Sequence, residues 1–160
     1  MDEILGFHTV RGYQLLEQHR KLLTPAMEDY LEMIYRNSLV EGYMRVNTLS
    51  ELLNVQPPST TNMVQKLTRL ELLNYKKYGI IFLTDTGKEL GKYLFERHKI
   101  IETFLKNIGV NENLLTETEL IEHSISASTL NKFELFNRYF KDHPTFVQSL
   151  EEYILSENKS

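Results

Sequence analysis

Acidic residues and a histidine recur at helical spacing in two parts of this 160-residue sequence. Glu119, Glu122 and His123 stand at i, i+3 and i+4, so a helix places two carboxylates and an imidazole on one face. Asp29 and Glu32 are spaced i, i+3 in the same way. Each motif therefore brings together donor atoms that suit a bound cation.

His98 lies between the two motifs and adds a second imidazole. Carboxylates with one or two imidazoles and no thiolate suit a divalent transition ion of intermediate hardness. The chain contains no cysteine, which excludes disulfides, Cys-type zinc sites, iron–sulfur clusters and a cysteine nucleophile. With four carboxylates, the site could hold two cations through bridging oxygens. The alternative interpretation is a structural acidic cluster on solvated helix faces.

A second set of polar residues is suited to reading DNA. The N-terminal end of a recognition helix points at base edges in the major groove and needs small polar side chains. Gln and Asn pair with adenine, Ser and Thr contact bases or phosphates, and Lys and Arg bind phosphates. The predicted DNA-contacting residues are Gln56, Pro58, Ser59, Thr60, Thr61, Asn62, Lys66, Arg69, Lys76 and Lys77. Taken alone, the same residues also fit an ordinary polar loop and helix start.

The elements that must position these residues follow from apolar spacing and from a few glycines and prolines. Thr24 is a good N-cap, and Pro25 is a good first residue of the helix that carries Asp29. Asn47 or Thr48 is the expected cap of the next helix. The predicted helices cover residues 3–22, 25–36, 46–55, 59–73, 85–107, 112–126, 128–141 and 144–157, with a break at 56–58 and a hairpin of strands 75–78 and 80–83.

This order of helix, helix-turn-helix, hairpin and helix predicts a mainly α fold that begins with a winged helix-turn-helix domain. Residues 56–92 are net positive and residues 93–160 net negative, which favours a phosphate-binding part beside a cation-binding part. The longest apolar run is four residues, and the acidic start is unlike a signal peptide. We therefore expect a soluble, intracellular protein with a cytoplasmic location.

The chain resembles the DtxR family of metal-dependent repressors, and most of all its manganese-responsive branch. The matching stretches are residues 24–35, 63–67, 83–88, 97–98, 108–110 and 121–123. Together they span about residues 23–142 in the family order. The resemblance implies three parts: an N-terminal extension over residues 1–23, a winged helix-turn-helix DNA-binding domain over 24–92, and an all-helical metal-binding and dimerisation domain over 93–160.

The resemblance also implies a function. The chain would be a Mn²⁺-activated repressor that controls metal homeostasis through manganese uptake, a homodimer on a palindromic operator, and not an enzyme. Its Mn²⁺, two ions per subunit, would be bound by Asp29, Glu32, His98, Glu119, Glu122 and His123. Iron-responsive members place a cysteine where this chain has Glu119, and carboxylate favours Mn²⁺. Activation by Fe²⁺, Zn²⁺ or Cd²⁺ stays open.

Two other functions use the same residues. One is a metal-independent winged-helix regulator whose acidic cluster is structural. The other is a metal-dependent hydrolase with a bimetal centre, which would leave the helix-turn-helix unexplained. Dependence of DNA binding on Mn²⁺ separates the repressor from the first alternative, and a turnover assay separates it from the second.

Overall fold

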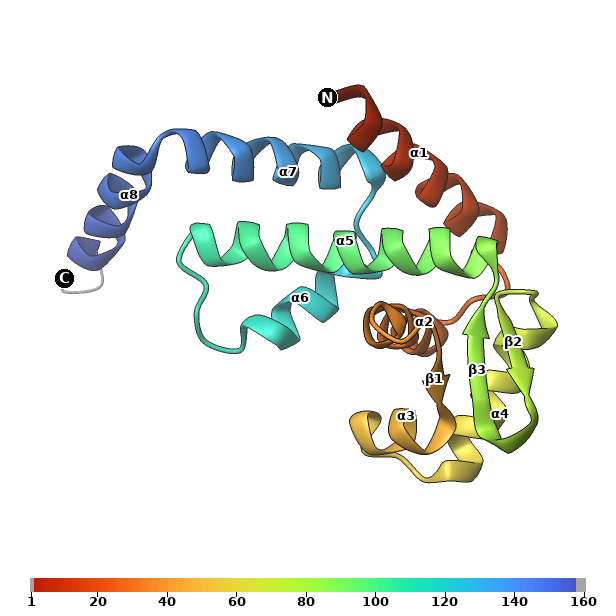
Figure 1. Ribbon diagram of the computed structural model, residues 1–160. Helices are drawn as coiled ribbons and strands as arrows, with labels where there is room; N and C mark the ends of the chain where they lie inside the picture. The colour runs from red at the N-terminus through yellow and green to blue at the C-terminus, as the bar shows by residue number, and fades with distance from the viewer. Residues whose placement is uncertain (1, 158–160) are drawn as a thin grey trace. The chain divides into compact units, whose positions relative to one another are not determined.

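The computed structural model describes residues 2–157 of the chain, and side chains from residue 10 onward. It forms two compact units, one ending at Phe95 and the other beginning at Glu96 (Figure 1). The first unit contains α1 (Asp2–His19), α2 (Pro25–Ser38), β1 (Met44–Arg45), α3 (Val46–Leu53), α4 (Pro57–Arg69), β2 (Leu73–Lys76) and β3 (Ile80–Leu83). Helix α5 (Asp85–Asn107) begins in the first unit and ends in the second, which also contains α6 (Leu114–Glu122), α7 (Ala127–Asp142) and α8 (Pro144–Glu157).

Helix α2 starts where the sequence predicts. The Thr24 side chain accepts a hydrogen bond of 3.3 Å from the backbone N–H of Met27, and Pro25 opens the helix. Leu31 and Ile34 are fully buried on the inner face of the helix. The cap thus sets where α2 begins, and the buried apolar face sets which side of the helix points outward.

The helix-turn-helix of α3 and α4 differs from the prediction at its caps. Neither Asn47 nor Thr48 caps α3, because the strand β1 leads directly into the helix and Arg45 takes the N-cap position. Asn54 ends α3 in the left-handed conformation, with φ 51°. The predicted break between the two helices is present, but it covers residues 54–56, because the prolines at 57 and 58 open α4; the predicted start at residue 59 is therefore wrong. Proline has no N–H to lose in the first turn of a helix.

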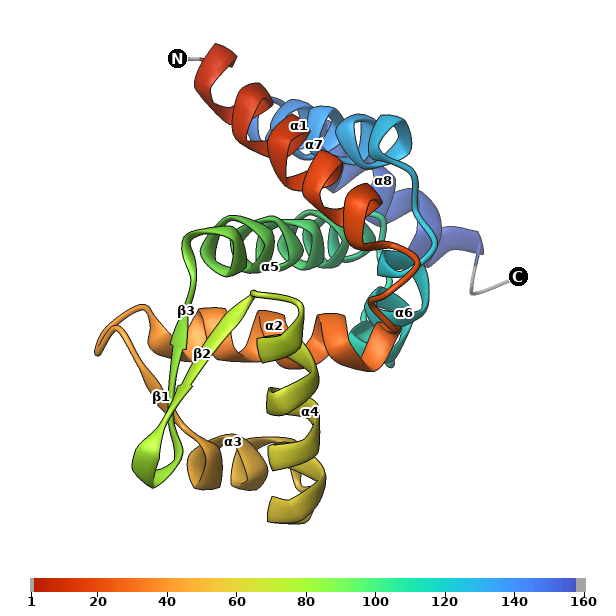
Figure 2. The same cartoon turned by 90° about the vertical axis from the view of Figure 1, so that its right-hand side faces the viewer.

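The wing is a three-stranded antiparallel sheet in the order β1-β3-β2 (Figure 2). The predicted helix end at Leu73 is wrong, because Leu73 pairs with Leu83 as the first residue of β2. A short 3₁₀ turn over Lys77–Gly79 joins β2 to β3. The two residues of β1 pair with β3, and the sequence analysis did not predict this strand.

The second unit is helical, as predicted. Phe104 of α5 stacks on Phe133 of α7 with ring centroids 4.0 Å apart. Asn137 of α7 donates a 2.9 Å hydrogen bond to the carbonyl of Ile100. The bounds of α8 match the prediction, whereas α6 is shorter than the predicted helix over 112–126. None of the helices over residues 2–157 has the length and apolar character that crossing a lipid bilayer requires.

Candidate metal centre and DNA-binding surface

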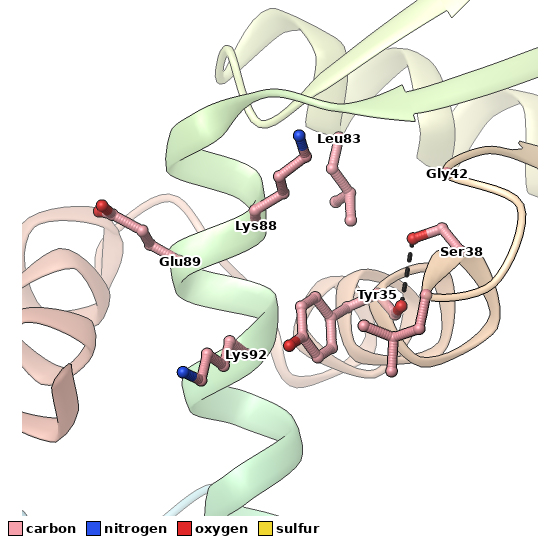
Figure 3. Close-up of a pocket in the computed structure, with 8 residues that line it drawn as sticks. Tyr35, Ser38, Gly42, Leu83, Lys88, Glu89 and Lys92 are labelled. Carbon is pink, nitrogen blue, oxygen red and sulfur yellow. Dashed lines mark hydrogen bonds between the residues drawn. The ribbon is translucent and has the colours of Figure 1, made fainter. Parts of the chain in front are cut away.

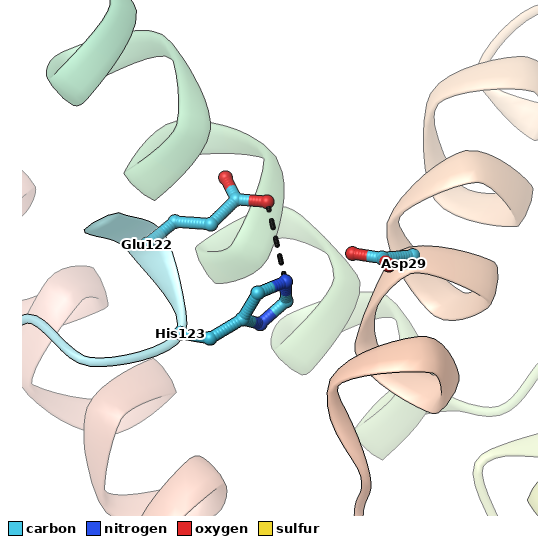
Figure 4. A group of neighbouring side chains, drawn as sticks. All are labelled: Asp29, Glu122 and His123. Carbon is cyan, nitrogen blue, oxygen red and sulfur yellow. Dashed lines mark ion pairs between the residues drawn. The ribbon is translucent and has the colours of Figure 1, made fainter. Parts of the chain in front are cut away.

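Glu122 lies between two imidazoles in the second unit. Its carboxylate oxygen Oε2 is 2.9 Å from Nδ1 of His98, and its other oxygen Oε1 is 3.7 Å from Nε2 of His123. Figure 4 shows the ion pair between Glu122 and His123. The Glu122 side chain is only 8% exposed. The fold therefore brings together three of the six predicted ligands within this unit.

Local structure explains how these side chains meet. Glu122 is the last residue of α6, and His123 follows as the C-cap with a right-handed helical backbone at φ −78° and ψ −10°. The helical backbone thus continues for one further residue. Glu122 reaches His98 on α5, and the His123 ring lies beside the Glu122 carboxylate. A buried carboxylate is costly unless a positive partner neutralises it. The donors here are oxygen and nitrogen, which fits a divalent transition ion.

Glu119 occupies a different environment from Glu122. It lies one turn earlier on α6 and is exposed to solvent. Their spacing in the sequence predicts Glu119 and Glu122 equally as metal ligands. The structure distinguishes them, because only Glu122 is buried against the imidazoles.

Helix α2 of the first unit carries the other predicted ligands. Asp29 is exposed and Glu32 is half-buried, one turn apart on the helix. Glu32 Oε1 is 3.9 Å from a guanidinium nitrogen of Arg36. Asp29 is drawn on α2 in Figure 4. The six predicted ligands are therefore divided between the two units, two on the first and four on the second.

The start of α4 presents most of the predicted DNA-contacting residues. Helix α4 begins at Pro57 with Gln56 as its N-cap, and its buried face carries Val64 and Leu67. The outer positions are solvent-exposed or, at Thr61, half-exposed; they are Gln56, Pro58, Ser59, Thr61, Asn62, Lys66 and Arg69. Lys76 and Lys77 are exposed on the wing. This surface offers amides, hydroxyls and cations to a nucleic acid.

Thr60 is an exception to that set. It is completely buried, and the hydroxyls of Ser50 and Thr60 form a hydrogen bond of 2.9 Å between α3 and α4. Thr60 lies four residues before Val64, about one helical turn, so both side chains lie on the inner face of α4. The structure thus gives Thr60 a packing role between α3 and α4, and its side chain is not on the exposed face of α4 that carries the other predicted DNA contacts.

The wing also carries an aromatic residue that sequence reasoning missed. Tyr78 is 93% exposed at the tip of the turn and has a left-handed backbone with φ 65°. Its neighbour Lys77 was predicted to contact DNA from its charge and its place in the wing. In the sequence, Tyr78 stands between Lys77 and a turn glycine, and this pattern could have indicated an aromatic residue at the tip of the wing.

Comparison with known proteins divides the chain into two domains, with a boundary before the Phe95–Glu96 limit of the two compact units. The family model described as the iron dependent repressor N-terminal DNA-binding domain matches residues 22–81. The model described as the iron dependent repressor metal-binding and dimerisation domain matches residues 84–146. The chain belongs to the DtxR family of metal-dependent repressors.

Individual members of the DtxR family are similar over most of this chain. The HTH-type transcriptional regulator MntR of Oceanobacillus iheyensis is 43% identical over 132 residues, which cover 82% of this chain and 90% of that protein. MntR of Listeria innocua is 41% identical over 130 residues, covering 81% and 92%.

Solved structures of the DtxR family share the fold. The manganese regulator SloR matches with a TM-score of 0.63 and 30% identity over 73% of this chain and 55% of that chain. The structure of ScaR with bound Zn²⁺ matches with a TM-score of 0.58 and 32% identity over 71% and 54%. This chain thus spans about half the length of those two structures.

Membership of the DtxR family establishes the class of function. The chain is a metal-dependent transcriptional regulator that binds DNA and divalent metal and self-associates through its second domain. DtxR-family proteins are not enzymes, so the hydrolase interpretation is wrong. The mainly α fold with a winged helix-turn-helix is confirmed.

Proposed function

We propose that this protein is a Mn²⁺-activated repressor of manganese uptake and that it acts in the cytoplasm as a homodimer on a palindromic operator. The observation that carries the proposal is the buried Glu122 carboxylate between His98 and His123, in a chain without a thiolate. The similarity to the MntR proteins and to the manganese regulator SloR supports manganese as the metal.

The proposed ligands are the two carboxylates of α2 and four residues of the second unit. They are Asp29, Glu32, His98, Glu119, Glu122 and His123. Four carboxylates and two imidazoles would supply donors for two ions per subunit. Hard carboxylate oxygens at every non-histidine position favour Mn²⁺ over softer ions. Since ScaR has been solved with Zn²⁺ and with Cd²⁺, these ions and Fe²⁺ are candidates for weaker activation here.

The domain limits of the proposal are an N-terminal extension at 1–23, a DNA-binding domain at 24–92 and a metal-binding and dimerisation domain at 93–160. The two family models meet between residues 81 and 84, and the first begins at residue 22. Helix α1, which ends at His19, therefore precedes the residues that the family models match.

The mechanism rests on the charges of the chain's own residues. A bound divalent cation supplies positive charge that offsets the repulsion among the carboxylates. Asp29 and Glu32 of the first unit would hold the ion together with His98, Glu119, Glu122 and His123 of the second. Ligands from both units would fix the separation of the two α4 helices in the dimer. Half-sites about one helical turn apart are met only at one separation.

Metal-dependent DNA binding tests the proposal. A DNA fragment is first selected for binding from a random library in the presence of Mn²⁺. Binding to it is then measured in separate titrations with Mn²⁺, Fe²⁺, Zn²⁺ and Cd²⁺, and in a chelator. We expect sequence-specific binding only with metal and at the lowest free concentration with Mn²⁺. Equal affinity in the chelator would leave the metal-independent regulator as the correct interpretation.

A further inference from the structure

Helix α1 packs on the first half of α5, although it lies outside the part of the chain that the family models match. The first of these models begins at residue 22, and α1 ends at His19. Arg11 Nε on α1 forms an ion pair of 2.7 Å with Glu89 Oε2 on α5. The rings of Tyr13 and Tyr93 meet edge to face with centroids 6.5 Å apart. Glu89 and Tyr93 lie one turn apart on α5, so the ion pair and the aromatic contact together define how α1 packs on α5.

The two helices cross in direct contact at Gly12. A Cβ atom at Gly12 would overlap the Cβ of Tyr93, so only glycine allows this approach. Glycine inside a helix is less favourable than alanine, because it has more backbone freedom to lose. The close packing of α1 on α5 therefore explains why glycine is present at position 12, whereas helix formation alone would favour alanine.

Helix α2 packs on α5 from another side. A Cβ atom at Gly91 would lie 2.7 Å from the Cβ of Tyr35, and the rings of Tyr35 and Phe95 are 5.9 Å apart. Gly91 is two residues from Glu89 and from Tyr93, which places it on the opposite face of α5 from the α1 contacts. Figure 3 shows Tyr35 and Glu89 on different sides of α5, beside a cavity of about 470 Å³.

The same chain connects the two packed helices. Residues 20–24 join α1 to α2, and Leu23 in this connection is buried. Helix α5 is thus held between two helices that are covalently linked to each other. A helix pair of this kind restrains α2 more than the α2–α5 contact alone.

We propose that α1 is a positioning element that holds α2 against α5, and so orders Asp29 and Glu32 before metal binds. The ligand role of these two residues rests on the proposed function above. A site ordered in advance loses less conformational freedom on binding and therefore binds more tightly. Gly12, Arg11 and Tyr13 are then positioning residues for a metal centre that they do not touch.

The substitution Gly12→Ala tests this proposal, with two measurements on the full chain. The first is hydrogen exchange of the α2 backbone amides in the metal-free protein, and the second is Mn²⁺ affinity by calorimetry. Alanine favours an isolated helix, so Gly12→Ala is neutral or stabilising if α1 only needs to be helical. We expect instead faster exchange in α2 and about tenfold weaker Mn²⁺ binding, equivalent to one or two more side chains ordered on binding.

Exchanging the charges of Arg11 and Glu89 tests the same proposal without changing Gly12. Arg11→Glu and Glu89→Arg should each speed exchange in α2, and the double variant should restore slow exchange and Mn²⁺ affinity. Arg20→Glu is the matched control, because the Arg20–Glu17 pair of 2.9 Å lies within α1 and its neighbouring turn. Unchanged exchange in α2 for Gly12→Ala and for both single charge variants would overturn the proposal. A wild-type protein that does not bind Mn²⁺ would refute the proposed function, while the exchange measurement would still decide the role of α1.

Discussion

At the scale of single residues, Glu122 holds a carboxylate where solvent barely reaches it. Both of its oxygens face imidazole nitrogens, at 2.9 Å from His98 and 3.7 Å from His123. Protonated imidazoles or a cation neutralise such a group, and an ordinary apolar neighbour does not. Glu122 is therefore the residue at which charge, burial and metal chemistry meet.

Replacing Glu122 with Gln should abolish activation of DNA binding by Mn²⁺. The amide keeps the shape of the side chain and accepts the hydrogen bond from His98, so the fold persists, but the negative charge is lost. We expect at least about 100-fold weaker Mn²⁺ binding, because even residues that only orient ligands cost 10–100-fold. Calorimetry gives the affinity and the stoichiometry. Glu117→Gln, an exposed position on the same helix, is the control, and equal Mn²⁺ stoichiometry in both variants would contradict the assignment.

Asn62 and Lys77 should differ in how they contribute to DNA binding. Asn62 is exposed near the start of α4, where we expect it to meet base edges, and Lys77 is exposed on the wing, where we expect it to meet phosphates. Asn62→Ala should cost roughly 1–3 kcal/mol at particular base pairs only, whereas Lys77→Ala should weaken all DNA evenly and lower the salt slope by about 1. Binding to operator and random DNA across salt concentrations measures both. Equal losses on the two DNAs for Asn62→Ala would contradict its role.

At the scale of elements, the helix-turn-helix depends on a buried hydrogen bond. The hydroxyls of Ser50 and Thr60 join α3 to α4 at 2.9 Å, and both residues are buried. The angle at which α4 is presented to DNA is thus set partly by this pair and partly by the apolar contacts of Val64 and Leu67.

Thr60→Val should destabilise the fold without removing a DNA contact. Valine has a similar shape and removes the hydrogen bond with Ser50, whose hydroxyl keeps its 2.9 Å bond to the Val46 carbonyl. The loss should therefore cost about 0.5–1.5 kcal/mol of the free energy of unfolding. Urea unfolding measures this cost, and Thr60→Ser, which keeps a hydroxyl, should recover most of it. A folded Thr60→Val protein of unchanged stability that has lost sequence-specific binding would show that Thr60 does reach the DNA.

The elements also show what the sequence could and could not predict. Helix α2 was predicted well because its cap, its first proline and its apolar face are all local features. The strand β1 was missed because its two residues exist as a strand only through pairing with Ile80 and Ile81, which lie far along the chain. The spacing of the acidic motif predicts which donors share a helix face, but the burial of Glu122 against His98 depends on tertiary packing across 24 residues.

In the molecule as a whole, the proposed metal ligands are divided between a DNA-binding unit and a dimerisation unit. On the proposed mechanism, the units should be loosely coupled without a cation. A bound cation would shift the population toward the state that binds DNA, by no more than its differential affinity for that state. The two binding events are therefore linked through one conformational equilibrium.

The coupling between metal binding and DNA binding is tested by the affinity for Mn²⁺ measured with and without saturating operator DNA. Reciprocity requires that operator tightens Mn²⁺ binding by the same factor by which Mn²⁺ tightens operator binding. For coupling of the usual size, about 1–3 kcal/mol, this factor is roughly 5 to 150. A chelator-buffered titration, with random DNA as the control, gives both factors. We predict two equal factors well above one; a Mn²⁺ affinity that is identical with and without operator would contradict the account, even if the protein binds both.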